Sequence, residues 1–295
     1  LLCNTTGVNN TAVGRNALFG NTTGACNTAV GVSALLCNTT GVNNTAVGRN
    51  ALFGNTTGAC NTAVGVSALL CNTTGVNNTA VGRNALLCNT TGASNTAVGQ
   101  GALCSNTTGV NNTALGQGAL NSNTTGVNNT AVGRFALSDI VSGSGNIGIG
   151  NTNSSGNYCP PVTLSANTSN YIVMGHDEIT EAHIQVDWTI ASDKRDKTEI
   201  EPVALGLDFV DQLNPVSYHY RKSRESDQPH GPKRYGFLAQ DILEIEGEEP
   251  VIINDINKDK LLYRQSSLIP VLVNAIKELH SQNKELMQKI EELEK

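Results

Sequence analysis

The chain has 295 residues and a formal net charge of −6 at pH 7, and its charges are distributed unevenly. Residues 1–138 contain no Asp, Glu or Lys and carry four arginines, whereas all 25 acidic residues lie in 139–295. Neither part has the clustered Lys and Arg that phosphate contacts need, so we expect no nucleic-acid partner. No stretch approaches the roughly 20 apolar residues of a membrane helix, so we also expect no membrane insertion.

The first part of the chain, 1–138, is a repeat. Asn-Thr-Thr-Gly recurs every 17 residues in eight units, and 4–37 is identical to 38–71. A short, constant period indicates stacked units, and Gly, Asn and Thr with short apolar runs indicate strands rather than helices. We predict a mainly β stalk: a β-roll, β-prism or β-solenoid. Its glycines should occupy positive-φ corners, and its asparagines should stack into ladders that bond to turn backbone.

Each unit offers only a few small apolar side chains, namely Ala, Val, Ala and Leu. We expect a lone chain to bury too little apolar surface to offset its ordering entropy, so several chains should associate, in a trimer by preference. Leu1-Leu2-Cys3 repeats the text of Leu35-Leu36-Cys37, which predicts that the sequence is the C-terminal part of a longer protein.

Three functional interpretations of the repeats compete with a plain spacer. Calcium-binding β-rolls need aspartates, which these units lack, so we expect no metal and no cofactor. Regular Thr-Thr pairs allow ice binding, and each Asn-Thr-Thr is formally a glycosylation sequon. The repeats also resemble, loosely, the Asn-x-x-Ala-x-Gly repeats of trimeric autotransporter adhesin heads and of viral fibres.

The cysteines of the repeats match no zinc-binding spacing. If one unit forms one rung, neighbouring rungs lie about 4.8 Å apart. Only Cys71–Cys88 and Cys88–Cys104 are then close enough for a disulfide within one chain. Bonds between chains stay open, and we expect the cysteines to act as small buried thiols.

Residues 139–191 break the repeat and predict a β-rich junction of short strands and turns. Near its end, Ile184, Val186, Trp188 and Ile190 alternate with polar residues, which is typical of a half-buried strand. This strand leads directly to Ala191.

The segment Ser192-Asp193-Lys194-Arg195-Asp196-Lys197 places a serine and a lysine five positions apart. A serine hydroxyl is a weak nucleophile that needs an adjacent base. A lysine can be that base only as a neutral amine, which desolvation favours. Burial of the pair at a subunit interface would therefore couple its chemistry to assembly.

This segment resembles the start of the C-terminal intramolecular chaperone domain of endosialidase-type phage tailspikes and fibres, serine peptidase family 74. Myelin regulatory factors share that domain. Further matches follow in the family's order over about 188–295: Thr198–Pro202, Leu213–Tyr218, Gly236–Asp241 (including Gly236, Phe237 and Gln240), Leu262-Tyr263 and the helix Leu272–Leu279.

The resemblance implies an α+β chaperone and peptidase domain over 192–267. Ser192 would attack the carbonyl of Ala191, and Lys197 would take the hydroxyl proton and pass it to the leaving amine, with Asp193 and Arg195 as supporting residues. The family usually has Leu where this chain has Asp196. A carboxylate there would hold Lys197 charged and slow cleavage. Within the Gly236–Gln240 motif, we expect Gly236 to allow a turn, Phe237 and Leu238 to enter the core, and Gln240 to satisfy backbone groups.

The C-terminal segment 268–295 predicts a coiled-coil helix. Its apolar residues fall into two heptad columns: Ile269, Ile276, Asn283 and Ile290 in one, and Leu272, Leu279, Leu286 and Leu293 in the other. Ile and Leu in this order with one Asn favour two strands, whereas the family resemblance implies three, which we prefer. A single amphipathic helix packed on its own domain is the alternative.

Taken together, the sequence predicts a homotrimeric viral fibre or tailspike-like protein at the virion surface, with a chaperone that trimerises the chain and cuts itself off. The resemblance also implies host attachment through a surface receptor. The alternatives are a non-cleaving surface adhesin or ice-binding-like repeat protein with a C-terminal trimerisation domain, and a regulator released by cleavage.

Overall fold

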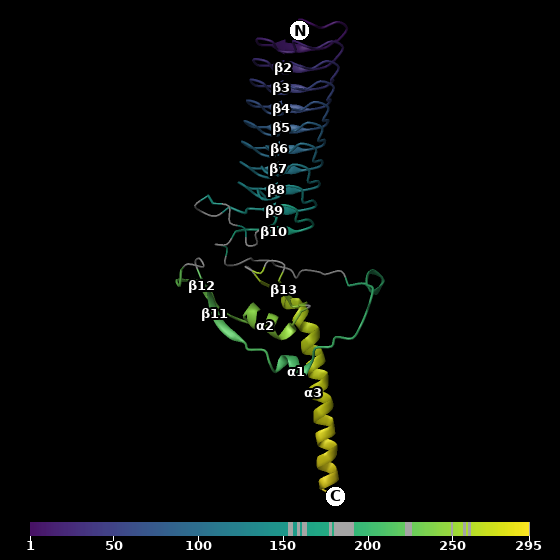
Figure 1. Ribbon diagram of the computed structural model, residues 1–295, viewed down its shortest axis with the longest axis vertical. Helices are drawn as coiled ribbons and strands as arrows, with labels where there is room; N and C mark the ends of the chain where they lie inside the picture. The colour runs from purple at the N-terminus through teal and green to yellow at the C-terminus, as the bar shows by residue number, and fades with distance from the viewer. Residues whose placement is uncertain are drawn as a thin grey trace. The chain divides into compact units, whose positions relative to one another are not determined.

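The computed structural model describes residues 1–152, 156–157, 160, 164–176, 179, 192–221, 226–248, 250–255, 258 and 261–294 (Figure 1). They divide into two compact units, 1–179 and 180–295. The strand expected over 184–190 lies outside the described residues.

The first unit is a parallel β-solenoid with one short strand per rung, as Figure 1 shows. Each strand pairs in parallel with its neighbours along the chain, and residues 17 positions apart are partners, as in Thr45 with Thr62. The prediction of stacked β units is confirmed. The strands are β1 (Thr11–Val13), β2 (Thr28–Val30), β3 (Thr45–Val47), β4 (Thr62–Val64), β5 (Thr79–Val81), β6 (Thr96–Val98), β7 (Thr113–Leu115), β8 (Thr130–Val132), β9 (Ile147–Ile149) and β10 (Ile172–Met174).

The parallel sheet continues beyond residue 138, where the Asn-Thr-Thr-Gly repeat ends. Gly148 of β9 pairs with Ala131 of β8, and Val173 of β10 pairs with Gly148. The last rung spans 25 residues between Ile147 and Ile172, so it carries an insertion relative to the 17-residue rungs. The end of the repeated text is therefore not the end of the solenoid.

The core of each rung is closed within a single chain. In one rung Ala46, Ala51 and Leu52 are fully buried, and the same three positions are buried along the repeats. The apolar residues alone are few, as expected. Two asparagines per rung fill the rest of the interior, such as Asn55 and Asn61, both fully buried.

These asparagines form the predicted ladders. Asn55 donates from Nδ2 to Asn38 Oδ1 (2.8 Å) and to the Gly58 carbonyl (2.9 Å). In the second ladder, the backbone N–H of Asn61 donates to Asn44 Oδ1 at 3.0 Å. Buried amides cost free energy when unpaired, so this bonding is what allows so polar an interior.

The first ladder ends at Asn123. Its Oδ1 is buried without a hydrogen-bond partner, because the equivalent residue of the next rung is Ile140.

Glycines occupy positive-φ corners, as predicted. Gly48 has φ +136°, and a Cβ there would lie 2.5 Å from the carbonyl oxygen of Gly65 in the next rung. The sequence did not indicate that a leucine in each repeat is also left-handed: Leu52 has φ 49°. Its complete burial offsets this unfavourable backbone conformation.

The second unit is a small α+β domain. It contains a 3₁₀ turn η1 (Lys194–Asp196), α1 (Leu207–Val210), the antiparallel pair β11 (Val216–Arg221) and β12 (Pro229–Gly236), α2 (Ala239–Glu246), the short antiparallel pair β13 (Ile253–Asn254) and β14 (Leu262–Tyr263), and the long helix α3 (Gln265–Leu293). Its core consists of Phe209, Ile242, Ile252, Ile253, Leu268 and Val271.

Helix α3 has two apolar faces. Leu268, Val271 and Ala275 are buried within the unit, so the first turns pack on their own domain. The predicted heptad columns lie on another face and are exposed, at Ile269, Leu272, Ile276, Leu279, Leu286, Ile290 and Leu293. The helix therefore packs on its own domain over its first turns and still presents an apolar seam, and the coiled coil stays a prediction.

Candidate functional site

The segment 192–197 folds into one tight turn. Asp193 begins η1, and its carboxylate accepts the backbone N–H of Arg195 at 2.9 Å. The Arg195 guanidinium donates to the same carboxylate from Nη2 (2.6 Å) and Nε (3.1 Å). These bonds hold the pKa of Asp193 below its ordinary value and raise the pKa of Arg195. Asp193 and Arg195, expected to support the motif, are therefore the pair that fixes the turn.

The turn brings the predicted pair of side chains into contact. Lys197 ends η1 with its backbone N–H bonded to the Lys194 carbonyl, and its Nζ donates to Ser192 Oγ at 2.7 Å. This is the distance that a nucleophile and its base need. To act as the base, the lysine would have to accept the serine proton along this contact, which only a neutral amine can do.

The pair is open to solvent in the single chain, since all nine residues from Ser192 to Ile200 are exposed. Water therefore solvates the Lys197 amine, and the desolvation that a lysine base requires is not supplied within one chain. Ala191, on the other side of the expected scissile bond, lies outside the described residues.

Asp196 does not form an ion pair with Lys197 in the described part of the chain, where both residues lie. The ion pair of this turn joins Asp193 and Arg195. The contact through which Asp196 was expected to hold Lys197 charged is thus not formed, although Asp196 still places a carboxylate next to Lys197 in sequence.

The Gly236–Gln240 motif lies elsewhere in the domain and not at the Ser192–Lys197 pair, the dyad. Gly236 ends β12, pairs with Val216 and contacts the Tyr218 ring, where a Cβ would lie 3.2 Å from a ring carbon; it therefore serves close packing rather than a turn. Phe237 packs against the core and meets the Tyr263 ring edge-on at 6.1 Å, as expected.

Two further expectations for this motif are wrong. Leu238 is 46% exposed, because it precedes α2 and points away from the core. Gln240 is exposed on the first turn of α2 and makes no hydrogen bond within the described residues, so it does not satisfy backbone groups.

Two carboxylates that sequence analysis did not single out organise the domain. Glu246 accepts the backbone N–H groups of Val251, Ile252 and Ile253 at 2.6–3.0 Å. Glu278 of α3 accepts the N–H of Leu207 at 2.7 Å. Neither glutamate belongs to a recognisable sequence motif. The sequence feature near these contacts is Gly206, which directly precedes the short helix α1.

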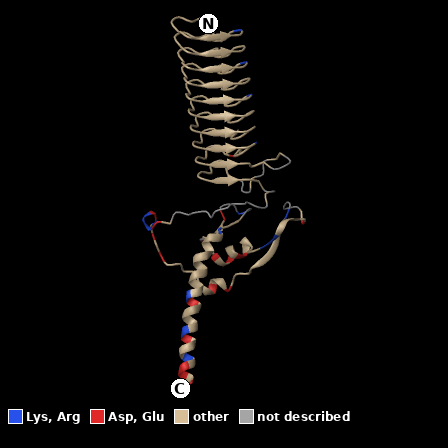
Figure 2. Ribbon diagram, turned by 180° about the vertical axis from the view of Figure 1, so that it is seen from behind, with Lys and Arg blue, Asp and Glu red and all other residues tan. Residues whose placement is uncertain are grey.

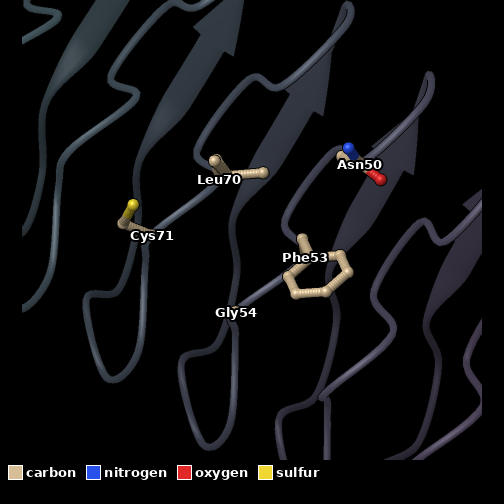
Figure 3. A pocket seen from close by; sticks show the side chains of 5 residues that line it. All are labelled: Asn50, Phe53, Gly54, Leu70 and Cys71. Atoms are coloured by element: carbon tan, nitrogen blue, oxygen red, sulfur yellow. The ribbon is translucent and has the colours of Figure 1, made fainter.

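The cysteines are not buried thiols, which corrects that expectation. All seven in the described residues are free and are exposed or half-buried. A shallow apolar depression of about 390 Å³ lies beside one of them, lined by Asn50, Phe53, Gly54, Leu70 and Cys71 (Figure 3). It contains no titratable group other than the Cys71 thiol, and we assign it no function.

The described residues contain no group of three or more His, Cys, Asp or Glu side chains arranged to hold a metal ion. Among them, no helix combines the length and hydrophobicity needed to cross a bilayer. The first threonine of each Asn-Thr-Thr-Gly is not free for an external ligand: Thr56 Oγ1, for example, donates to the Thr73 carbonyl of the next rung at 3.1 Å.

Comparison with known proteins identifies the segment that contains the dyad. Residues 192–252 match the family described as chaperone of endosialidase. No curated protein and no solved structure matches the chain significantly. The match begins at Ser192 and supports an intramolecular chaperone in the C-terminal part of a fibre-like protein.

Proposed function

We propose that the chain, with its chaperone-of-endosialidase segment at 192–252, is part of a homotrimeric viral fibre or tailspike-like protein of the virion surface. The C-terminal unit trimerises the chain and then cleaves it between Ala191 and Ser192. The family match supports the chaperone role. The observation that carries the cleavage is the 2.7 Å hydrogen bond between Lys197 Nζ and Ser192 Oγ, at the first residue of the matched segment.

The exposed face of α3 supports association of the C-terminal units. Ile276 is 66% exposed and Leu286 55%, although both belong to a regular apolar heptad pattern. Such a seam is stabilised when further helices cover it. The heptad rule alone favours two helices and the family favours three; we propose three.

The repetition of the solenoid explains the need for a chaperone. Neighbouring rungs are nearly identical, so two stalks shifted by one or more rungs would contact each other almost as well as two aligned stalks. A C-terminal unit that first joins the chains at one defined level removes this ambiguity. Cleavage then removes this unit. Chains that separate afterwards lack the unit that aligned them, so disassembly is slow to reverse.

The proposed cleavage is an acyl shift followed by hydrolysis. A neutral Lys197 amine takes the Ser192 hydroxyl proton while Ser192 Oγ attacks the Ala191 carbonyl carbon, and the proton then passes to the leaving Ser192 nitrogen. Water hydrolyses the resulting ester. The products are a free Ala191 carboxylate and a fragment, 192–295, that begins with Ser192.

Solvent exposure of the dyad in the single chain supports control by assembly. Subunits that pack over 192–200 would remove water from Lys197 and favour its neutral form. Cleavage is then confined to assembled chains.

The test is expression of the full chain and of Ser192→Ala, Lys197→Ala and Lys194→Ala variants, with denaturing gels and N-terminal sequencing. We expect the parent and Lys194→Ala, the matched control from the same turn, to split into two fragments, the smaller beginning at Ser192. The other two variants should stay intact. An intact parent chain that is trimeric in solution would instead support a non-cleaving adhesin.

A further inference from the structure

The outer face of the solenoid strands is apolar and free of charge along its whole length. We define the strand face as the first and third residues of β1–β10, whose side chains point outward. The middle residue is buried in β2–β10, as Ala63 is between Thr62 and Val64. The first position is Thr in eight strands and Ile in two, and the third is always Val, Leu, Ile or Met. A sheet face that is solvated normally carries charged or strongly polar side chains.

The ten rungs are related copies of one unit, so the residues of the strand face can be compared from rung to rung. In β9 and β10 the repeat has diverged, and Asn-Thr-Thr-Gly has become Ile140-Val-Ser-Gly143 before β9. The strand face nevertheless becomes more apolar there: Ile149 is 42% exposed and Met174 52% exposed. The buried positions do not require this, because an outward side chain plays no part in the core.

A second apolar column does not persist in the same way. It contains Phe53 and Leu70, shown in Figure 3, but the equivalent residues in later rungs are Cys104, Asn121 and Ser138. The strand face is therefore an apolar surface that continues through all ten rungs. Exposed arginines such as Arg49 and Arg83 follow the strand ends in the sequence. Figure 2 shows blue basic residues along one edge of the solenoid. An apolar centre with Arg beside it is the composition of a protein interface.

We infer that the strand face is the contact surface between the stalks of the trimer, so its occupant is a second copy of this chain. This inference rests on the trimer of the proposed function. A partner that contacts successive rungs evenly must itself repeat about every 4.8 Å, and another copy of the solenoid does so. The absence of charge from the face removes like-charge repulsion between identical surfaces.

The size of the face explains why this contact depends on the C-terminal unit. Ten strands of three residues cover a flat area on the order of 500 Å². A stable free-standing interface buries about 800 Å² per partner. The strand faces therefore associate when the chains are already held together, and the test uses the uncleaved chain.

The test is photo-cross-linking in the full-length Ser192→Ala chain, with p-benzoylphenylalanine placed at Val64 or, in separate protein, at Thr57. Both residues are exposed and lie in the same 17-residue unit of the solenoid, but Thr57 is outside the strand face. We expect light scattering to give a trimer for both, and cross-linked dimers and trimers of the chain from Val64 alone.

A trimer that gives no interchain product from Val64, or equal products from Thr57, would overturn the assigned face and leave the proposed trimer intact. A monomer would overturn both. A product of Val64 with a different protein would also overturn the inference, since it would show another occupant. As a second variant, Val47→Glu/Val64→Glu/Val81→Glu should abolish the products of a reporter at Val98, whereas Thr40→Glu/Thr57→Glu/Thr74→Glu should retain them.

Discussion

Glu278 in α3 accepts the backbone N–H of Leu207, 71 residues earlier in the chain, at 2.7 Å. The neighbouring Asn274 side chain donates to the Leu205 carbonyl (2.9 Å) and to the Glu278 carboxylate (3.1 Å). A carboxylate at the start of a helix satisfies an N–H that the helix itself leaves unbonded. The C-terminal helix thus holds the segment that follows the dyad.

This contact predicts a specific role for Gly206. A Cβ at this position would overlap the Glu278 carboxylate, so Gly206→Ala must push Glu278 away from Leu207. We expect a loss of about 1–3 kcal/mol in the free energy of unfolding of the C-terminal unit, from lost bonding and overpacking. Urea unfolding followed by the helical circular dichroism signal measures it.

The matched background for this variant is Glu278→Ala. With the carboxylate gone, Gly206→Ala should cost much less, so the double-mutant cycle should be strongly non-additive. Equal costs in the two backgrounds would show that the glycine acts through something other than Glu278.

Replacement of Asp196 should accelerate cleavage. Once subunits cover the turn and withdraw water from it, a carboxylate next to the lysine in sequence would stabilise the charged amine, so Asp196→Leu should raise the cleavage rate about three- to tenfold, the effect of roughly 1 kcal/mol. The rate is measured as loss of intact chain on gels over time. Asp196→Asn separates the two causes: it should give most of the gain if charge is responsible and little if desolvation by Leu is responsible. An unchanged rate in both variants would remove Asp196 from the account.

The asparagine ladder predicts a position-dependent cost. Asn72 donates to Asn55 Oδ1 and accepts from Asn89, so Asn72→Ala leaves buried groups unpaired and should cost about 1–3 kcal/mol. Asn123 already has an unpaired Oδ1, so Asn123→Ala should cost less. Thermal unfolding of the β signal compares them, with the exposed Thr74→Ala as a control within about 0.5 kcal/mol of the parent. Equal losses at Asn72 and Asn123 would contradict the ladder argument.

The thiols of Cys71 and Cys104 should react slowly. Cys104 is half-buried and Cys71 is exposed, yet neighbouring atoms partly desolvate both thiols; this, and secondly the nearby Cys88, raises the pKa of both above the ordinary value. A raised pKa lowers the fraction of reactive thiolate at a given pH, so iodoacetamide should label these two more slowly than the exposed Cys26 and Cys60. Mass spectrometry of peptides gives the rates. Cys88→Ser should speed the labelling of Cys71 and Cys104. Identical labelling rates with and without Cys88 would show that Cys88 does not influence the two thiols.

Periodicity made the solenoid predictable, because residues one period apart must occupy equivalent places in a stack. Periodicity also extends the predicted solenoid to β9, since Asn146 stands 17 residues after Asn129. The left-handed Leu52 could not be predicted, because local preference disfavours it and only the closed core favours it. The apolar residues of a unit also do not reveal how the interior is filled, because buried asparagines occupy much of it.

The candidate site was predictable in its local geometry and not in its surroundings. Five residues of spacing and the Asp193–Arg195 pair suffice to bring Lys197 to Ser192, since every contact involved lies within the turn. The burial that a lysine base needs depends on other chains, and no pattern within 192–200 specifies it. The role of Glu278 could not be predicted from the sequence, because its partner is a backbone group 71 residues away.

Each rung bonds only to the rung before it and the rung after it, so the number of rungs sets the length of the stalk. A further copy of the 34-residue text shared by 4–37 and 38–71 would add two rungs, about 9.6 Å of reach, without changing any existing contact. Duplication or loss of such a segment in a gene therefore changes the length of the stalk in fixed steps while the folding of every other rung stays the same.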